Sequence, residues 1–145
     1  MKCVLGIVVI LAAGISAMPA HKSMQAETEC LEEKQVTMQQ VLPYVHKYTD
    51  PADKENVGDY LLCVWQKKKI IDEEGSVNSK NLARYLFGIY AKVGLTETQK
   101  GEVYKESEKC EDLKEENLST LAVKVKNCML TAWDNLGYLK PPTKQ

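Results

Sequence analysis

The sequence predicts an all-α protein of six helices joined by two disulfides. Apolar residues recur every three or four positions, which is the period of an amphipathic helix, and no stretch shows the sustained alternation of a strand. Helix-capping patterns and turn-forming clusters divide the chain into segments of helical length. Four cysteines, an even number, remain once a predicted N-terminal leader is removed.

Residues 1–17 are the predicted leader, a secretory signal peptide. Lys2 precedes an uninterrupted apolar run over residues 4–13, and small residues follow. A run of about ten residues is too short to cross a bilayer, which takes roughly 20, so we expect cleavage rather than a retained anchor. Cleavage after Ala17, with Ala20 as the second candidate, leaves a single domain over residues 18–145 of a secreted, extracellular protein.

Cysteine usage fits this oxidising compartment. Cys3 lies in the leader, and the mature chain keeps Cys30, Cys63, Cys110 and Cys128. Their spacing lacks the clustering typical of zinc ligands, so we expect two disulfides and no metal. Four cysteines allow three pairings, which leaves the connectivity open at this point.

Two helices are expected in the first part of the mature chain. A polar helix spans about Met24 to Lys34. A short helix begins at Thr37, whose spacing to Gln40 is that of a capping box. Pro43 limits the regularity of this second helix.

A third helix is expected from Asp50. The order Asp-Pro-Ala-Asp supplies an N-cap, a proline at the first helical position and an acid in the first turn. The apolar face of this helix consists of Val57, Tyr60, Leu61, Val64 and Trp65. The three lysines at positions 67–69 favour the negative end of the helix dipole, and a turn follows over residues 72–76.

The fourth helix begins near Asn78 or Ser79, and Gly94 is its expected stop. Its expected inward face consists of Leu82, Leu86, Ile89 and Tyr90. A second capping pattern, Thr96 with Gln99, opens the fifth helix. The fifth helix presents Val103, Tyr104 and Cys110 at helical spacing.

The last helix, from Asn117 to about Trp133, is the most apolar. One stripe consists of Leu118, Leu121, Ala122, Val125, Met129 and Trp133, and another of Val123 and Leu130. Two stripes imply burial on both sides, which places this helix in the middle of the domain. The segment from Asn135 through the prolines at 141 and 142 is expected to be a non-helical tail.

Charge and motif content exclude several functions. With 19 basic and 20 acidic side chains, the chain has no basic stripe to neutralise phosphates, so nucleic acid is not an expected partner. His21 and His46 are its two imidazoles, and His21 lies at the start of the mature chain. We find no nucleophile elbow, phosphate-binding loop, metalloprotease motif or calcium loop, so we expect neither an enzyme nor a cofactor.

The cysteine arrangement resembles that of the insect odorant-binding proteins over the whole mature chain. The gaps between cysteines are 32, 46 and 17 residues, and Gly-Ser-Val-Asn at 75–78 lies between the second and third. The full pattern of that family has six cysteines. Here Asp59, four positions before Cys63, and Ser119, nine before Cys128, replace both members of one bridge. This paired loss resembles the family's four-cysteine branch, called minus-C.

The resemblance implies bridges Cys30 to Cys63 and Cys110 to Cys128, and helices packed around an internal apolar cavity. It implies a non-enzymatic carrier of a small hydrophobic ligand, such as an odorant, pheromone or fatty acid, without stable membrane insertion. A membrane receptor and a second copy of the chain are open as partners. Without the third bridge, we expect a looser wall between the third and last helices.

The expected ligand-binding residues are Leu61, Val64, Trp65, Leu86, Tyr90, Val103, Leu121, Val125, Met129, Trp133 and Tyr138. Among them, Tyr90 and Tyr138, together with Tyr104, are the expected hydroxyl donors to a ligand head group. Trp133 and Tyr138 are also expected to fold the tail over the cavity mouth. Each wall residue fits a plain core equally well, and periodicity alone favours a filled core. The alternative function is therefore a secreted helical signalling or interaction protein with a solid core.

Overall fold

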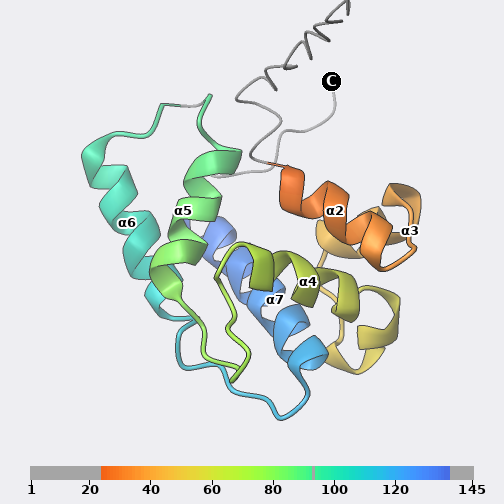
Figure 1. The fold of residues 1–145 in the computed structure, drawn as a ribbon. Coiled ribbons are helices and arrows are strands. Elements are labelled where there is room, and N and C mark those ends of the chain that lie inside the picture. Colours follow the sequence, from red (N-terminus) through yellow and green to blue (C-terminus); the bar gives the residue numbers. More distant parts are fainter. Residues whose placement is uncertain (1–23, 93, 138–145) are drawn as a thin grey trace, which may run out of the picture.

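The computed structural model describes residues 24–92 and 94–137 (Figure 1). Within them, the elements in chain order are α2 (Gln25–Glu33), α3 (Met38–Val45), the 3-10 helix η1 (Pro51–Asn56), α4 (Gly58–Lys67), α5 (Ser79–Ile89), α6 (Glu97–Glu108) and α7 (Leu118–Leu136). The all-α fold class with six α-helices is confirmed for this part of the chain. The predicted leader with its cleavage sites, Cys3, His21 and Tyr138 lie outside the described residues.

Helix starts follow the capping signals of the sequence. Thr37 Oγ1 accepts from the Gln40 backbone N–H, and the Gln40 side chain accepts from the Thr37 N–H, so the predicted capping box is present. Thr96 and Gln99 form the same reciprocal pair at the start of α6. Each box satisfies two backbone donors that have no partner inside the helix.

The third predicted helix is wrong as a single element, because the segment after Asp50 forms η1 and then a separate helix, α4. Asp50 Oδ1 accepts from the Ala52 N–H at 2.9 Å, which closes a tight turn that competes with a regular helix. Asp53 has φ −87° and ψ 23°, and Val57 has φ −148°, so α4 begins only at Gly58. The predicted apolar face is nevertheless buried, since it lies on α4 and the residue before it.

The fourth predicted helix differs from α5 in one inward residue and in its end. Ile89 is 42% exposed, and the buried stripe instead consists of Ser79, Leu82, Ala83 and Leu86, followed by Tyr90 just after the helix. At 3.6 residues per turn, Ile89 falls at the edge of that stripe. Because α5 ends at Ile89, Gly94 does not stop the helix; it lies in the connection to α6, with φ +68°.

The ends of α6 and α7 also differ from prediction. α6 ends at Glu108, so Cys110 lies in the turn after the helix. α7 extends to Leu136, which makes Asn135 and Leu136 helical rather than part of a tail. Gly137 caps α7 in the left-handed region with φ 68°, where glycine meets no Cβ clash. The rest of the predicted tail lies outside the described residues.

α7 lies in the middle of the molecule, as its two apolar stripes predict (Figure 1). It packs against α4, α6 and η1. Two polar residues of α7 are buried as well. Lys126 Nζ donates to the Lys47 carbonyl and to Thr49 Oγ1, and Asn127 bonds the backbone N–H and C=O of Thr49 at 3.1 and 2.7 Å. These bonds hold the connection between α3 and η1 against α7.

Two disulfides join the helices. Cys30–Cys63 links α2 to α4, and Cys110–Cys128 links the turn after α6 to α7. This is the pairing that the family resemblance implies. Each bridge removes conformational freedom from the unfolded chain and thereby favours the folded state.

The two positions of the missing bridge face each other. Ser119 Oγ on α7 donates to Asp59 Oδ1 on α4. Among the described elements, α4 and α7 form the most extensive contact, and Trp65 Nε1 donates to the Ala122 carbonyl across it at 3.0 Å. Polar contacts and packing therefore hold these two helices together where a disulfide would, and the looser wall expected between them stays a prediction.

Candidate functional site

The predicted ligand-binding residues that the structure describes gather in one buried apolar cluster. They come from α4, α5, α6, α7 and the residue after α5, and none is more than 5% exposed. They are Leu61, Val64, Trp65, Leu86, Tyr90, Val103, Leu121, Val125, Met129 and Trp133. Tyr138 falls outside the described residues. The residues that were predicted from helical spacing therefore belong to one continuous interior. That they contact a ligand stays a prediction.

Aromatic rings connect α5 to its neighbours in this cluster and along its border, where Tyr85, Phe87 and Tyr104 are partly buried. Phe87 meets Tyr104 of α6 edge to face, with ring centroids 5.1 Å apart. Tyr90 meets Trp133 of α7 in the same way at 5.8 Å. Nearer the middle of α5, Tyr85 packs against Trp65 of α4, with ring centroids 5.2 Å apart. Edge-to-face pairs of this kind add about 0.5–1.5 kcal/mol beyond simple burial.

The two tryptophans differ in how their indole N–H groups are satisfied. Trp65 Nε1 donates to the Ala122 carbonyl. Trp133 Nε1 is buried and has no hydrogen-bond partner among the described residues. Tyr90, whose ring meets Trp133, is buried as well, and burial raises the pKa of its phenol to about 12, so the hydroxyl is neutral at physiological pH.

A charged group lies at the edge of the interior between α2, α4 and α5. Glu27 pairs with Lys68 at 3.1 Å, and the Lys68 ammonium sits 5.0 Å from the centre of the Tyr85 ring. Burial, with a smaller contribution from the Glu27 charge, raises the pKa of Tyr60 to about 12 and also raises the pKa of Tyr85. Both phenols are therefore neutral at physiological pH.

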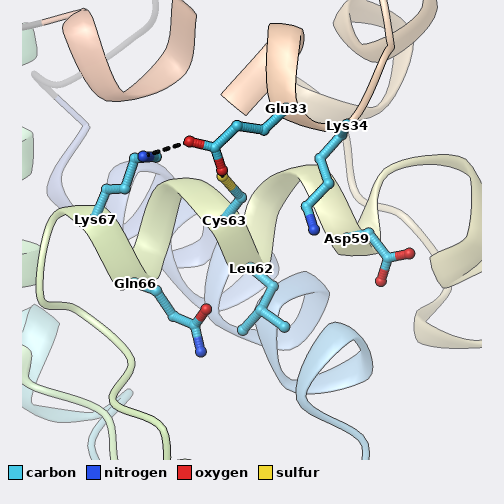
Figure 2. Close-up of a pocket in the computed structure, with 7 residues that line it drawn as sticks. All are labelled: Glu33, Lys34, Asp59, Leu62, Cys63, Gln66 and Lys67. Carbon is cyan, nitrogen blue, oxygen red and sulfur yellow. Dashed lines mark hydrogen bonds and ion pairs between the residues drawn. The ribbon is translucent and has the colours of Figure 1, made fainter. Parts of the chain in front are cut away.

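One surface cleft, of about 210 Å³, lies where α2 crosses α4 (Figure 2). Its lining residues are Glu33, Lys34, Asp59, Leu62, Cys63, Gln66 and Lys67. Figure 2 shows Lys67 reaching Glu33 over the outer side of α4, an ion pair of 2.7 Å. Hydrogen bonding to Glu33, and then to Glu29, raises the pKa of Lys67. Through its ion pairs with Glu29 and Glu33, Lys67 ties the end of α4 to α2.

A second surface cleft, of about 380 Å³, lies beside the Cys110 turn. It is lined by Lys69, Asp72, Ser76, Val77, Asn78, Ser79, Lys80 and Glu111. Neither this cleft nor the one in Figure 2 contains a predicted ligand-binding residue. Most of the lining side chains are polar or charged, which does not suit an alkyl chain. The interior cluster is therefore the better candidate site for an apolar ligand.

Other kinds of site find little support in the described residues. They contain no group of three or more His, Cys, Asp or Glu side chains placed to hold a metal ion. None of the described helices is long and apolar enough to cross a membrane. His46 caps the C-terminal end of α3 and is exposed.

Sequence reasoning missed two polar features of the interior. Lys126 lies on an apolar stripe of α7, four residues after Ala122, so the stripe itself carried the signal of a buried lysine. No sequence pattern predicts that the Trp133 N–H lacks a hydrogen-bond partner among the described residues, because the partner of a buried donor depends on tertiary packing.

Comparison with known proteins agrees with the cysteine pattern and the fold. The sequence matches the PBP/GOBP family over residues 16–132, which is most of the chain. No curated protein matches the sequence.

Proposed function

The chain belongs to the PBP/GOBP family, the family of insect odorant-binding proteins, and from this premise we propose that it is a secreted carrier of a small hydrophobic ligand. An odorant, pheromone or fatty acid would be taken up and moved through extracellular fluid. Proteins of this family are binding proteins rather than enzymes. The observation that carries the proposal is the gathering of the predicted wall residues of α4, α5, α6 and α7 in one buried apolar cluster.

The energetics support this proposal. Burying an alkyl chain gains about 0.8 kcal/mol per methylene, so a ten-carbon tail gains about 8 kcal/mol before the entropic costs of association. Micromolar affinity corresponds to about 8 kcal/mol, so further contacts between ligand and protein must supply about 4 kcal/mol or more to offset those costs. In the described structure the wall residues pack against one another, so we propose that a ligand enters by separating side chains of this cluster.

Titration of the mature protein with long-chain alcohols and fatty acids tests the proposal. We expect tryptophan emission to change with micromolar midpoints, because Trp65 and Trp133 both lie in the cluster. A matched pair of variants locates the site. Val103→Phe fills the interior and should weaken binding about tenfold, whereas Leu62→Phe, which changes the cleft of Figure 2, should leave affinity within about twofold of wild type. A flat emission response across the panel would count against a carrier.

We also propose that the chain belongs to the four-cysteine branch and that residues 1–17 are removed on secretion. The hydrogen-bonded pair Asp59 and Ser119 at the positions of the absent bridge supports the first point. Alkylation of the secreted protein should modify no cysteine before reduction and four after it. N-terminal sequencing should begin at Met18, and a retained leader would add Cys3 as a fifth reactive thiol.

A second candidate function is a secreted signalling or interaction protein with a solid core. One observation favours it: both clefts described above lie on the surface, outside the apolar cluster. Such a protein would ignore every lipophilic ligand in the titration and would bind a receptor through its surface. The titration therefore separates the two functions, because they predict opposite results with the same panel.

A further inference from the structure

Three side-chain polar atoms of the described residues are buried without a hydrogen-bond partner: Glu27 Oε2, Ser107 Oγ and Trp133 Nε1. Leaving such a group unpaired costs about 1–3 kcal/mol, so each needs a physical reason. The other carboxylate oxygen of Glu27 already pairs with Lys68. The Ser107 hydroxyl lies on α6, where a small rotation of the side chain brings it to a carbonyl of its own helix.

Trp133 has no such adjustment available. Its indole is 5% exposed and lies edge to face against Tyr90, with an interplanar angle of 86°. A packed indole cannot turn its N–H elsewhere without moving the whole ring. The indole N–H therefore keeps its direction, and it can donate only to an acceptor atom that a neighbouring group or a ligand places beside it.

The surroundings of Trp133 suit a ligand better than a protein partner. Trp133 belongs to the apolar cluster of predicted wall residues, so an elongated ligand in that cluster lies within reach of the indole. α5 and α7 approach each other less closely along their backbones than α4 and α7 do, and the Tyr90–Trp133 ring contact bridges them. Trp65 shows that an indole of this interior can be satisfied by a backbone carbonyl where one is near.

We propose that Trp133 Nε1 is the polar anchor of the site and donates a hydrogen bond to an oxygen acceptor at one end of the ligand. The preferred ligands are therefore long-chain ketones, aldehydes, esters, alcohols or acids, and pure hydrocarbons of the same shape bind less well. This inference rests on the proposed carrier function and deepens it. It turns a generic apolar site into one that distinguishes oxygenated chains from hydrocarbons.

Two ligands of the same shape test the anchor. In 2-undecanone the carbonyl oxygen is an acceptor, and in 2-methyl-1-undecene a methylidene group takes its place. Each ligand displaces an apolar fluorescent probe from the mature wild-type protein, from Trp133→Phe and from the control variant Leu62→Phe. The measured quantity is the ratio of the two inhibition constants within each protein, so differences in probe affinity and in ligand solubility cancel between variants.

We expect the ratio to favour the ketone about tenfold more in wild type than in Trp133→Phe, because one buried hydrogen bond is made and one unsatisfied donor is relieved. Leu62→Phe should keep the wild-type ratio, since Leu62 lines the surface cleft and is not one of the predicted wall residues. An equal ratio in wild type and Trp133→Phe overturns the anchor while the carrier function stands. If neither ligand displaces the probe from wild type, the carrier proposal itself fails.

A second measurement covers the case in which Trp133→Phe does not fold. In Trp65→Phe, Trp133 is the single tryptophan, because the chain has two. Its emission should shift to longer wavelength when the ketone binds and should not do so when the alkene binds. The same shift with both ligands overturns the anchor.

Discussion

A third disulfide should form between α4 and α7 when Asp59 and Ser119 are both replaced by cysteine. The Ser119 hydroxyl and the Asp59 carboxylate are in hydrogen-bond contact, so their Cβ atoms lie on facing surfaces of the two helices. Cysteine has nearly the size of serine, so Ser119→Cys introduces little steric change. Asp59→Ser with Ser119 unchanged is the matched control, because it places serine where the variant has cysteine and cannot form a bond.

The expected stabilisation follows from the length of the loop. The two positions are 60 residues apart, for which loop-closure entropy gives about 4 kcal/mol at 25 °C. The Cys110–Cys128 bridge does not shorten this loop, because Ser119 lies midway between its two cysteines. The lost hydrogen bond between side chains near the surface offsets at most about 1 kcal/mol. A net gain of about 3 kcal/mol raises the melting temperature by about 10 °C in a chain of this size.

Thermal unfolding followed by circular dichroism measures the gain, and mass spectrometry without reduction counts the disulfides. We expect three disulfides and a melting temperature about 10 °C above that of wild type. The rise over Asp59→Ser should be somewhat larger, because that control has also lost the hydrogen bond. Two free thiols in the fully oxidised variant would show that the side chains do not face each other. A third disulfide without any rise in melting temperature would refute the loop-entropy reasoning.

Three other substitutions test polar groups of the fold. Asn127→Ala removes both bonds to the Thr49 backbone and should lower the free energy of unfolding in a urea titration by about 2–3 kcal/mol, and an unchanged midpoint would show that these bonds contribute nothing. Thr96→Ala removes the N-cap of α6 and should cost about 1 kcal/mol, whereas a cost near zero would mean that the end frays. Burial lowers the pKa of Lys126 to about 8, against 10.5 in the unfolded chain, so the unfolded chain binds more protons between these pH values. Because the three tyrosines with raised pKa values lose stability near pH 10 in both proteins alike, the test is the difference between wild type and Lys126→Met. Between pH 8 and 10.5 wild type should gain up to about 3 kcal/mol relative to Lys126→Met, and a difference that does not change with pH would contradict this assignment.

Features set by neighbouring residues were predictable from the sequence. The capping boxes at Thr37 and Thr96 join residues three apart, so the pattern that predicts them contains both partners. The central place of α7 follows from two apolar stripes, which need neighbours on both sides whatever those neighbours are. The buried apolar residues of α7 were predicted for the same reason, because their spacing along the sequence alone defines the two stripes.

Features set by distant residues were not predictable in the same way. Lys126 finds its acceptors at Lys47 and Thr49, which lie 79 and 77 residues earlier in the chain. The break between η1 and α4 has a local signal in the side chain of Asp50, but proline at the next position favours a regular helix start equally well. The state of the Trp133 N–H depends on which groups tertiary packing leaves beside it.

The distribution of these contacts indicates where a ligand enters. On one side, α7 is held to α4 by Trp65 and Ala122 and by Asp59 and Ser119. The same helix is also held to the α3–η1 connection by buried hydrogen bonds. Opening that side breaks several buried hydrogen bonds at once, at about 1 kcal/mol or more each. Between α5 and α7, the described contacts include the ring contact of Tyr90 with Trp133, and the Trp133 N–H has no hydrogen bond to a described residue that separation would break. If the chain is the carrier that we propose, we therefore expect a ligand to enter beside Trp133, where its carbonyl oxygen can accept from the indole N–H.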